Sequence, residues 1–387
     1  MQDVSIVGIG MTPVGEHWEL GLRELSQQAI QAALEDAGLR LQDVNALVVG
    51  NALGTYINNQ SHVAALVADY AGLHGVEAFR VEAMDASGGV ALRQGMQMIA
   101  SGAAEVVLVV GVENVTDVVG AARHNALATA LDAEFEAAHG VTPVAVAGMM
   151  MRRYMHEYGV ALNQFEGFSI NAHLNGSKNQ NAMYRNKLKP GAFAAAPAVA
   201  DPVTLFDSAP DADGACALVL TRTERAKDMI PVPVRVKSSA AATDTLAVHS
   251  REDVLFLRAA NVAAGRAYQL AGIAPTDIHL LELHDAYTIL TALQLEAIGF
   301  AERGRGWGLA VDNKIGLTGE LPISTFGGLK ARGNPLGATG VYQAAEVALQ
   351  LRGTAGENQV PNARIGMALN LGGLGTTAVA HILERVD

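Results

Sequence analysis

The chain has 387 residues, of which 50% are hydrophobic and 17% are charged. This length and composition exclude a disordered or fibrous protein and predict a globular protein with two domain-sized halves. The net charge of −12 argues against binding to a phosphate backbone, so no nucleic-acid role is expected.

The single cysteine, Cys216, excludes an internal disulfide and a metal site built from several cysteines, and no metal is expected. The first residues lack the basic stretch and the long apolar run of a signal peptide. The most apolar segment, Val106 to Val112, lies between two glutamates and is too short to span a membrane. A cytoplasmic location without membrane attachment is therefore expected.

Short apolar runs alternate with helical patterns along the chain, which predicts a layered α/β fold. In the first part, we predict strands at Val4–Ile9, Ala46–Val49, Glu105–Gly111 and Ala215–Leu220, with helices at Leu20–Ala37 and Ala86–Ala100. Pro231-Val232-Pro233 then indicates a join, because two prolines interrupt both a helix and a strand ladder. After this join, we predict strands at Val234–Lys237, Ile278–Leu283, Arg364–Leu369 and Ala378–Leu383, with helices at Val254–Ala271, Tyr287–Gly299 and Ala338–Arg352.

The letters on the two sides of the join repeat, which predicts two copies of one α/β unit. Ala37-Gly38-Leu39, followed by Leu47, matches Ala271-Gly272-Ile273, followed by Leu281, at a constant offset. We therefore predict an N-terminal half at residues 1–230 and a C-terminal half at residues 231–387. An insertion at about 116–199 interrupts the first half, and its length is typical of a loop domain placed over a site.

Three glycine-rich turns are candidates for binding a ligand: residues 85–89, 333–340 and 372–375. The first two precede predicted helices, whose N-terminal N–H groups could hold an anion or an oxyanion. The alternative is tight packing between a strand and a helix, which also requires residues without side chains. The pattern alone leaves both interpretations open.

A second candidate is His284-Asp285-Ala286-Tyr287, which follows a predicted strand and precedes a helix. Sheets of α/β proteins bind ligands at such positions, and histidine can donate a hydrogen bond or move a proton near neutral pH. A structural His–Asp pair is the alternative. Cys216 lies among Ala, Leu and Val in a predicted strand and is expected to be a packing residue.

Motifs along essentially the whole chain carry a family resemblance. They are residues 5–12, residues 80–88, Met151-Arg152-Arg153-Tyr154-Met155, Asp213-Gly214-Ala215, His284-Asp285, Gly327-Gly328-Leu329-Lys330, residues 333–340 and residues 370–375. In this order and spacing they resemble the thiolase superfamily, in particular archaeal-type acetoacetyl-CoA thiolases and sterol-carrier-protein-type thiolases. The resemblance implies the thiolase fold, in which two repeated βα units form a five-layer αβαβα sandwich with an inserted loop domain.

The chain departs from the family where thiolases do their chemistry. The cysteine that thiolases acylate corresponds to Asp85, and the histidine of their Gly-His-Pro motif corresponds to Asn334. The two positions at which thiolases place a second, acid/base cysteine are Ala286 and Asn370. A carboxylate is a poorer nucleophile than a thiolate. An acylated Asp85 would therefore not take the place of the thioester intermediate that thiolases form on their cysteine. The resemblance therefore implies an acyl-CoA enzyme that works without a cysteine acyl intermediate.

Aldol or retro-aldol cleavage of a 3-hydroxyacyl-CoA suits this set of residues, because it needs a base and an enolate-stabilising site but no acyl transfer. Asp85 or Tyr287 would transfer the proton, while Asn334 and His284 would donate hydrogen bonds to the enolate. The CoA thioester would be the substrate, and no further cofactor is expected. For Asp85, the helix dipole is expected to lower the pKa, and a role as helix N-cap is the alternative. For Tyr287, packing is the alternative.

The resemblance also assigns substrate-binding roles to Asp285 and Gly375 and an oxyanion-binding backbone N–H to Gly372. It implies a homodimer or a dimer of dimers, with contacts near Asp85 and the apolar strand Val106–Val110. A small protein with a zinc ribbon and an OB-fold is the second partner that it implies, as a helper for CoA binding. Two other functions remain open: a non-catalytic subunit that binds CoA or a partner, and a divergent acetyl-CoA acyltransferase.

Overall fold

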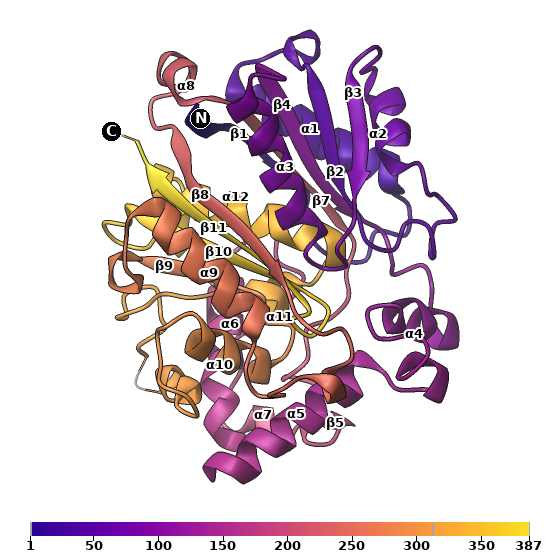
Figure 1. Cartoon of the computed structure of the whole chain (residues 1–387), viewed down its shortest axis with the longest axis vertical. Coiled ribbons are helices and arrows are strands. Elements are labelled where there is room, and N and C mark those ends of the chain that lie inside the picture. The colour runs from indigo at the N-terminus through magenta and orange to yellow at the C-terminus, as the bar shows by residue number, and fades with distance from the viewer. Residues whose placement is uncertain (1, 312, 387) are drawn as a thin grey trace.

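Residues 2–311 and 313–386 are described in the computed structural model (Figure 1). Their main sheet has nine strands in the order β3-β2-β4-β7-β1-β8-β11-β10-β9, and β5 and β6 form a separate pair. The strands are β1 (Val4–Met11), β2 (Ala46–Gly50), β3 (Glu77–Val81), β4 (Val106–Glu113), β5 (Ala198–Ala200), β6 (Val203–Thr204), β7 (Gly214–Arg222), β8 (Val234–Thr243), β9 (Leu280–Leu283), β10 (Ile365–Gly372) and β11 (Thr377–Arg385).

The α-helices surround this sheet and also build the insertion. They are α1 (Leu22–Ala37), α2 (Val63–Ala71), α3 (Ser87–Ser101), α4 (Gly120–Ala128), α5 (Pro143–Tyr158), α6 (Glu166–Gly176), α7 (Ala192–Ala195), α8 (Thr223–Met229), α9 (Arg258–Ala271), α10 (Thr288–Ala297), α11 (Gly328–Arg332) and α12 (Thr339–Arg352). Short 3-10 helices are η1 (Leu41–Asp43), η2 (Ala137–His139), η3 (Leu162–Phe165), η4 (Val248–Ser250), η5 (Pro275–Asp277), η6 (Gly306–Ala310), η7 (Leu336–Ala338) and η8 (Gly356–Asn358).

The sheet contains one strand order twice, which confirms the predicted doubling of an α/β unit. β2-β4-β7-β1 in the first half corresponds to β9-β10-β11-β8 in the second. The β2–β4 and β9–β10 pairs are both parallel, and the β4–β7 and β10–β11 pairs are both antiparallel. The two halves join where Ser5 and Ile6 of β1 pair with Arg235 and Val234 of β8.

Helices form three layers around the two halves of the sheet. α1 and α2 pack on one face of the first half, and α9 and α10 pack on one face of the second half. α3 and α12 lie between the halves, contact each other and share one core with strands from both halves. This arrangement is the five-layer αβαβα sandwich that the family resemblance implies.

Glycines allow the two central helices to begin close together. A Cβ on Gly88 would lie 2.7 Å from the backbone nitrogen of Val341, and one on Gly340 would lie 2.2 Å from that of Gly89. Only residues without a side chain permit this approach. Tight packing therefore explains these glycines, and it brings the turns before α3 and α12 to one place.

The predicted insertion contains α4 to α7 and occupies the lower part of the view in Figure 1. Thr142 caps α5, because its Oγ1 accepts a hydrogen bond from the backbone N–H of Ala145 at 3.3 Å, and Pro143 follows at the first helical position. The helix ends at Gly159, which has a left-handed φ of 65°. These local signals fix the start and the end of α5.

Some boundaries differ from the predictions. The helix predicted at Val254–Ala271 begins at Arg258, because Leu257 has a non-helical ψ of 78° and the Asp253 carboxylate holds a turn through the N–H of Leu255 at 2.9 Å. α2, α8, α11 and β3 were not predicted. None of the residues of β3 is fully buried, and their burial does not alternate, so the strand lacks the apolar pattern that predicts one.

The strand predicted to contribute to a dimer contact is internal. β4 lies between β2 and β7, and all its residues are buried. The expectation that Val106–Val110 forms part of a subunit contact is therefore wrong, because its apolar character serves the core. β3 is the strand at that end of the sheet.

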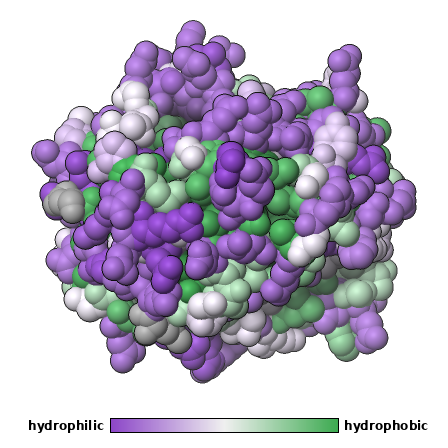
Figure 2. Space-filling model, turned by 90° about the horizontal axis from the view of Figure 1, so that it is seen from above, coloured by the Kyte–Doolittle hydropathy of each residue, from purple (hydrophilic) through white to green (hydrophobic). Residues whose placement is uncertain are grey.

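Figure 2 shows the molecule from above, relative to the view of Figure 1. On this face, hydrophilic residues surround a hydrophobic area. Large exposed apolar side chains include Trp18, Val119 and Leu270. Within the described ranges, no helix combines the length and the hydropathy needed to cross a membrane.

Candidate active site

A cavity of about 170 Å³ lies where the two central helices begin and where the insertion covers the sheet. Asp85, His284, Tyr287 and Asn334 all line it. The structure thus brings together the four side chains to which the sequence assigns a catalytic role. They come from three loops that precede α3, α10 and α12.

Asp85 lies on a tight turn before α3. The residue before it, Met84, has a left-handed φ of 50°, and the Ser87 hydroxyl holds the turn through hydrogen bonds with the Ala83 N–H (2.9 Å) and the Met84 carbonyl (2.5 Å). A left-handed φ is strained for a residue with a side chain, and such strain often occurs at functional sites. The turn presents the Asp85 carboxyl group to the cavity.

Two neutral groups hold the Asp85 carboxyl. The Asn334 amide Nδ2 donates to Oδ1 at 3.3 Å, and the backbone N–H of Gly373 donates to Oδ2 at 3.4 Å. The side chain is buried, with 7% of the residue's surface exposed, and this burial raises its pKa. The expected lowering by the helix dipole is therefore wrong, because desolvation outweighs it. Asp85 is also not the cap of α3, since the N-cap position is Ala86.

Asn334 is fixed from both sides of its amide. The Thr339 hydroxyl donates to Asn334 Oδ1 at 2.7 Å, which leaves Nδ2 facing Asp85. Its backbone is held by the segment before β7, through the Pro210 carbonyl at 2.9 Å and the Ala212 N–H at 3.1 Å. Asn334 is therefore a positioned hydrogen-bond donor in the cavity.

His284 is a buried, neutral side chain in the cavity wall. Gln294 holds its backbone, because Oε1 accepts from the His284 N–H at 3.1 Å and Nε2 donates to its carbonyl at 2.8 Å. Among the described residues, Nδ1 has no hydrogen-bond partner. Burial lowers the pKa of His284 to about 4, although Asp285 opposes this shift. At neutral pH the ring can donate a hydrogen bond but carries no charge.

Tyr287 ends the same loop, beside three carboxyl groups. Burial raises the pKa of its phenol, and the nearby charges of Asp211, Asp85 and Asp207 raise it further. The phenol therefore keeps its proton throughout the neutral range. It can act as a hydrogen-bond or proton donor, as the sequence predicts.

The remaining predicted residues do not line the cavity. The Asp285 carboxylate accepts hydrogen bonds from the Leu329 N–H at 2.7 Å and the Ser324 hydroxyl at 3.2 Å, so it holds the loop before α11. Gly372 pairs with Thr377 within the sheet. The backbone N–H of Gly373, the next residue, donates to Asp85 Oδ2 at 3.4 Å. Gly375 packs against a leucine outside the cavity.

Sequence reasoning missed a charged pair in the cavity wall, Arg123 and Asp211. Arg123 of α4 donates to Asp211 Oδ2 through Nε at 2.7 Å and also through Nη2. His124, beside Arg123, lines the same cavity. Asp211 lies two residues before the family motif Asp213-Gly214-Ala215, whereas no sequence pattern indicates its partner Arg123 in the insertion.

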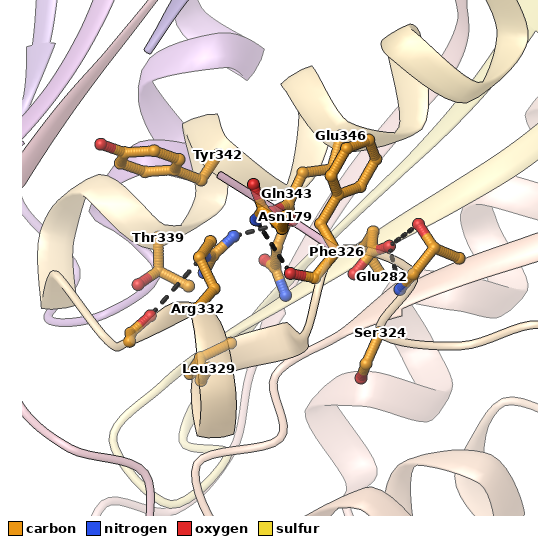
Figure 3. Close-up of polar contacts among 12 residues, drawn as sticks. Asn179, Glu282, Ser324, Phe326, Leu329, Arg332, Thr339, Tyr342, Gln343 and Glu346 are labelled. Atoms are coloured by element: carbon orange, nitrogen blue, oxygen red, sulfur yellow. Dashed lines mark hydrogen bonds and ion pairs between the residues drawn. The ribbon is translucent and has the colours of Figure 1, made fainter. Parts of the chain in front are cut away.

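A buried polar network surrounds Arg332 of α11 and Glu346 of α12 (Figure 3). Arg332 donates to Glu346 Oε2 at 2.7 Å, and its guanidinium lies 5.0 Å from the centre of the Tyr342 ring. Glu282 accepts from the backbone N–H of Thr325 at 2.7 Å and from its hydroxyl at 2.6 Å. Burial raises the pKa of Glu282. The Arg332–Glu346 pair joins α11 to α12. Gln350 of α12 donates to the Thr325 hydroxyl at 3.0 Å, which links Glu282 of β9 to the same helix.

Comparisons with known proteins identify similar proteins over most of the chain. The family profile described as "Thiolase, N-terminal domain" matches residues 4–197, and "Thiolase C-terminal domain-like" matches residues 240–385. An acetyl-CoA acetyltransferase of Methanothermobacter thermautotrophicus is 43% identical over 385 residues, which cover 100% of each chain. This chain belongs to the thiolase family.

Two further comparisons place this thiolase-family chain among its relatives. Sterol carrier protein 2 of Oryctolagus cuniculus is 30% identical over 399 residues, with 98% of this chain and 72% of that protein covered. The solved structure titled "Ltp2-ChsH2(DUF35) aldolase" superposes with a TM-score of 0.86 at 26% identity and covers 99% of this chain and 98% of its own. The predicted family and fold are therefore confirmed.

The only thiol of this thiolase-family chain lies away from the cavity. Cys216 is fully buried in β7, where it pairs with Met11 of β1 and Gly111 of β4. Burial raises the pKa of the Cys216 thiol. The sequence interpretation of Cys216 as a packing residue agrees with this position. Within the described ranges, no cluster of three or more His, Cys, Asp or Glu side chains could hold a metal ion.

Proposed function

We propose that this thiolase-family chain is an acyl-CoA lyase that makes or breaks a C–C bond beside a CoA thioester, without a cysteine acyl intermediate. The observation that carries the proposal is the content of the cavity. It holds the Asp85 carboxyl, the Asn334 amide, a neutral His284 and the Tyr287 phenol, whereas the single cysteine lies in the sheet. These groups supply proton transfer and hydrogen bonds, which an aldol-type reaction needs.

In the cleavage direction, the substrate is a 3-hydroxyacyl-CoA. A base removes the proton of the 3-hydroxyl group, the C2–C3 bond breaks to release an aldehyde or a ketone, and its electron pair forms the enolate of the shortened acyl-CoA. Asn334 and His284 donate hydrogen bonds to the enolate oxygen, and Asp85 or Tyr287 returns a proton to C2. The thioester itself is the substrate, and the reaction needs no other cofactor.

A divergent acyltransferase is the second candidate, because the relative with 43% identity carries the name acetyl-CoA acetyltransferase. Acyl transfer through a thiolase mechanism requires an acyl carrier of thioester energy. Asp85 does not provide one, which favours the lyase. A non-catalytic subunit that binds CoA would share the fold but would turn over no substrate.

The test is a panel of 3-hydroxyacyl-CoAs and 3-oxoacyl-CoAs given to the purified protein, with the acyl-CoA products followed by mass spectrometry. Cleavage of a 3-hydroxyacyl-CoA that Asp85→Ala and Asn334→Ala abolish supports the lyase. Thiolytic cleavage of a 3-oxoacyl-CoA supports the acyltransferase. CoA binding without turnover of any substrate supports the subunit.

We also propose a homodimer or a dimer of dimers and a cytoplasmic location. β3 supports the dimer, because it lies at the end of the sheet with a strand on one side only. Equilibrium sedimentation should give at least twice the mass of one chain at micromolar concentration, and a stable monomer contradicts the dimer.

We further propose that a small zinc-ribbon and OB-fold protein binds this chain and assists CoA binding. The two-component title of the aldolase with similar structure supports a second protein. Exposed cations of the insertion, such as Arg152 and Arg153, are few for a phosphate-rich ligand and a chain of net charge −12. Co-expression with such a protein should give a complex that binds CoA more tightly than this chain alone. Equal CoA affinity contradicts the proposal.

A further inference from the structure

Two carboxyl groups share the cavity, and their partners differ in charge. Within the described ranges, the hydrogen-bond partners of the Asp85 side chain are neutral donors, the Asn334 amide at 3.3 Å and the Gly373 N–H at 3.4 Å. Asp211 contacts a cation, the guanidinium of Arg123, with Nε at 2.7 Å from Oδ2. A cation stabilises the ionised form of a carboxyl group far more than a neutral donor does.

The position of Asp211 links it to the other cavity residues. In the segment that contains Asp211, the Ala209 N–H donates to the Ala286 carbonyl at 2.8 Å. The Pro210 carbonyl of the same segment accepts from the Asn334 N–H at 2.9 Å. Asp211 thus lies on a connecting segment, residues 209–211, between the His284–Tyr287 loop and the Asn334 loop. The hydrogen bonds of this segment fix the Asp211 backbone, and Arg123 of the insertion fixes its carboxylate.

We propose that Asp211 is the catalytic base that removes the 3-hydroxyl proton, while Asp85 is the acid that protonates C2 of the enolate. This division rests on the lyase activity proposed above. Two carboxyl groups whose surroundings separate their protonation states form an acid and base pair. The Arg123 guanidinium favours the ionised form of Asp211, whereas the amide and the backbone N–H that hold Asp85 are neutral and burial favours its protonated form.

The proton balance of one cleavage is complete with these two groups. Asp211 takes the hydroxyl proton, C2–C3 breaks with formation of the carbonyl product, and the electron pair passes to the enolate. The Asp85 carboxylic acid then protonates C2. Exchange with solvent resets the pair, because the side chains of Asp211 and Arg123 are 15% and 41% exposed.

Burial raises the pKa of both carboxyl groups, and only for Asp211 does a cation oppose this rise. The charged or titratable groups that act on Asp211 are Arg123 and His124 of α4 and Asp85 before α3, and Tyr287 also lies near it. Removal of the Arg123 charge should therefore raise the pKa of Asp211 and move the acidic limb of the cleavage rate to higher pH.

The first experiment separates the two proton transfers. Cleavage of 3-hydroxyacyl-CoAs requires both carboxyl groups. Exchange of the C2 protons of acetyl-CoA in D₂O is the reverse of the C2 protonation step, so it requires the carboxylate form of Asp85 and does not require Asp211. Asp211→Asn should lower the cleavage rate by about 100-fold or more and keep the exchange rate. Asp85→Asn should lose both. Asp36→Asn is the matched control, because Asp36 pairs with Arg352 at 2.6 Å on α1, away from the cavity, and should keep both rates.

Each other outcome decides the matter. Cleavage by Asp211→Asn at the normal rate, or equal loss of cleavage and exchange, overturns the division of roles while the lyase function stands. If the unsubstituted protein neither cleaves 3-hydroxyacyl-CoAs nor exchanges the C2 protons of acetyl-CoA, the lyase function is overturned, and the inference falls with it. If Asp211→Asn fails to fold, Arg123→Met provides the test, because an unmoved acidic limb of its pH profile also overturns the inference.

Discussion

The Asn334 amide lies 3.3 Å from the Asp85 carboxyl, although the two residues are 249 positions apart. They meet because α3 and α12 come from opposite halves of a doubled fold and begin side by side in its central layer. The contact places a carboxyl and a neutral amide where thiolases are implied to hold a cysteine and a histidine. A positioned amide can donate to an enolate oxygen, but it cannot activate a thiol as a base.

The orientation of that amide depends on Thr339, whose hydroxyl donates to Asn334 Oδ1 at 2.7 Å. Thr339→Val removes this donor and frees the amide to turn its oxygen toward the cavity. We expect turnover to fall about 10-fold, which corresponds to about 1.4 kcal/mol of barrier. Thr221→Val is the control, because the hydroxyl of this buried threonine donates to the backbone carbonyl of Glu105 outside the cavity. Steady-state kinetics should show no change in its turnover.

Cys216 should be dispensable for activity. Cys216→Ala leaves the cavity unchanged and removes one packed atom from β7, so we expect turnover within about two-fold of normal and a stability loss of about 1 kcal/mol. Steady-state kinetics and urea unfolding measure the two effects. Abolished turnover in a folded Cys216→Ala protein would return the thiol to the mechanism.

Glu113 should make stability depend on pH. Its buried carboxylate accepts from Asn51 Nδ2 and from the N–H groups of Ala52, Leu53 and Gly337. Burial nevertheless raises the pKa of Glu113 from 4.5 to about 7. The folded chain therefore binds this proton more tightly than the unfolded chain does. The proton on Glu113 therefore contributes fully to the free energy of unfolding below pH 4.5, and this contribution is lost as the pH rises through about 7.

The measurement is the free energy of unfolding of the normal protein minus that of Glu113→Gln, which lacks the titrating group. This difference should fall by about 3 kcal/mol as the pH rises through this window. A difference that stays constant with pH would mean that Glu113 keeps its ordinary pKa.

Gly328 should tolerate no side chain. Its φ is 53°, and a Cβ there would lie 2.3 Å from Asp285 Oδ2. Gly328→Ala should cost more than about 2 kcal/mol, because the clash adds to the left-handed backbone cost. Gly38→Ala is the matched control: its φ is 63° but a Cβ there meets nothing within 4 Å, and it should cost only about 1 kcal/mol. Equal losses in urea unfolding would show that the Asp285 contact yields.

The sequence predicts most strands of the main sheet and the long helices outside the insertion, because buried apolar runs and glycine stops such as Gly38 and Gly272 are local signals. It predicts no helix within the insertion, although α5 has 16 residues. It also predicts that Asp85 and Asn334 share a site, through the family motifs that contain them. The pKa of Asp85 was predicted in the wrong direction, because burial raises it and the side chain is enclosed by loops distant in sequence, such as those of Asn334 and Gly373. The contact between Arg123 and Asp211 depends on how α4 packs, which no local pattern encodes.

The central claim is a C–C lyase without a covalent acyl intermediate. Its most direct test gives the protein a 3-hydroxyacyl-CoA and, in parallel, a 3-oxoacyl-CoA with free CoA, and records products and intact protein by mass spectrometry. We predict a shortened acyl-CoA and a carbonyl product from the 3-hydroxyacyl-CoA, with no mass added to the protein. Thiolysis of the 3-oxoacyl-CoA with an acyl group bound to the protein would contradict the claim.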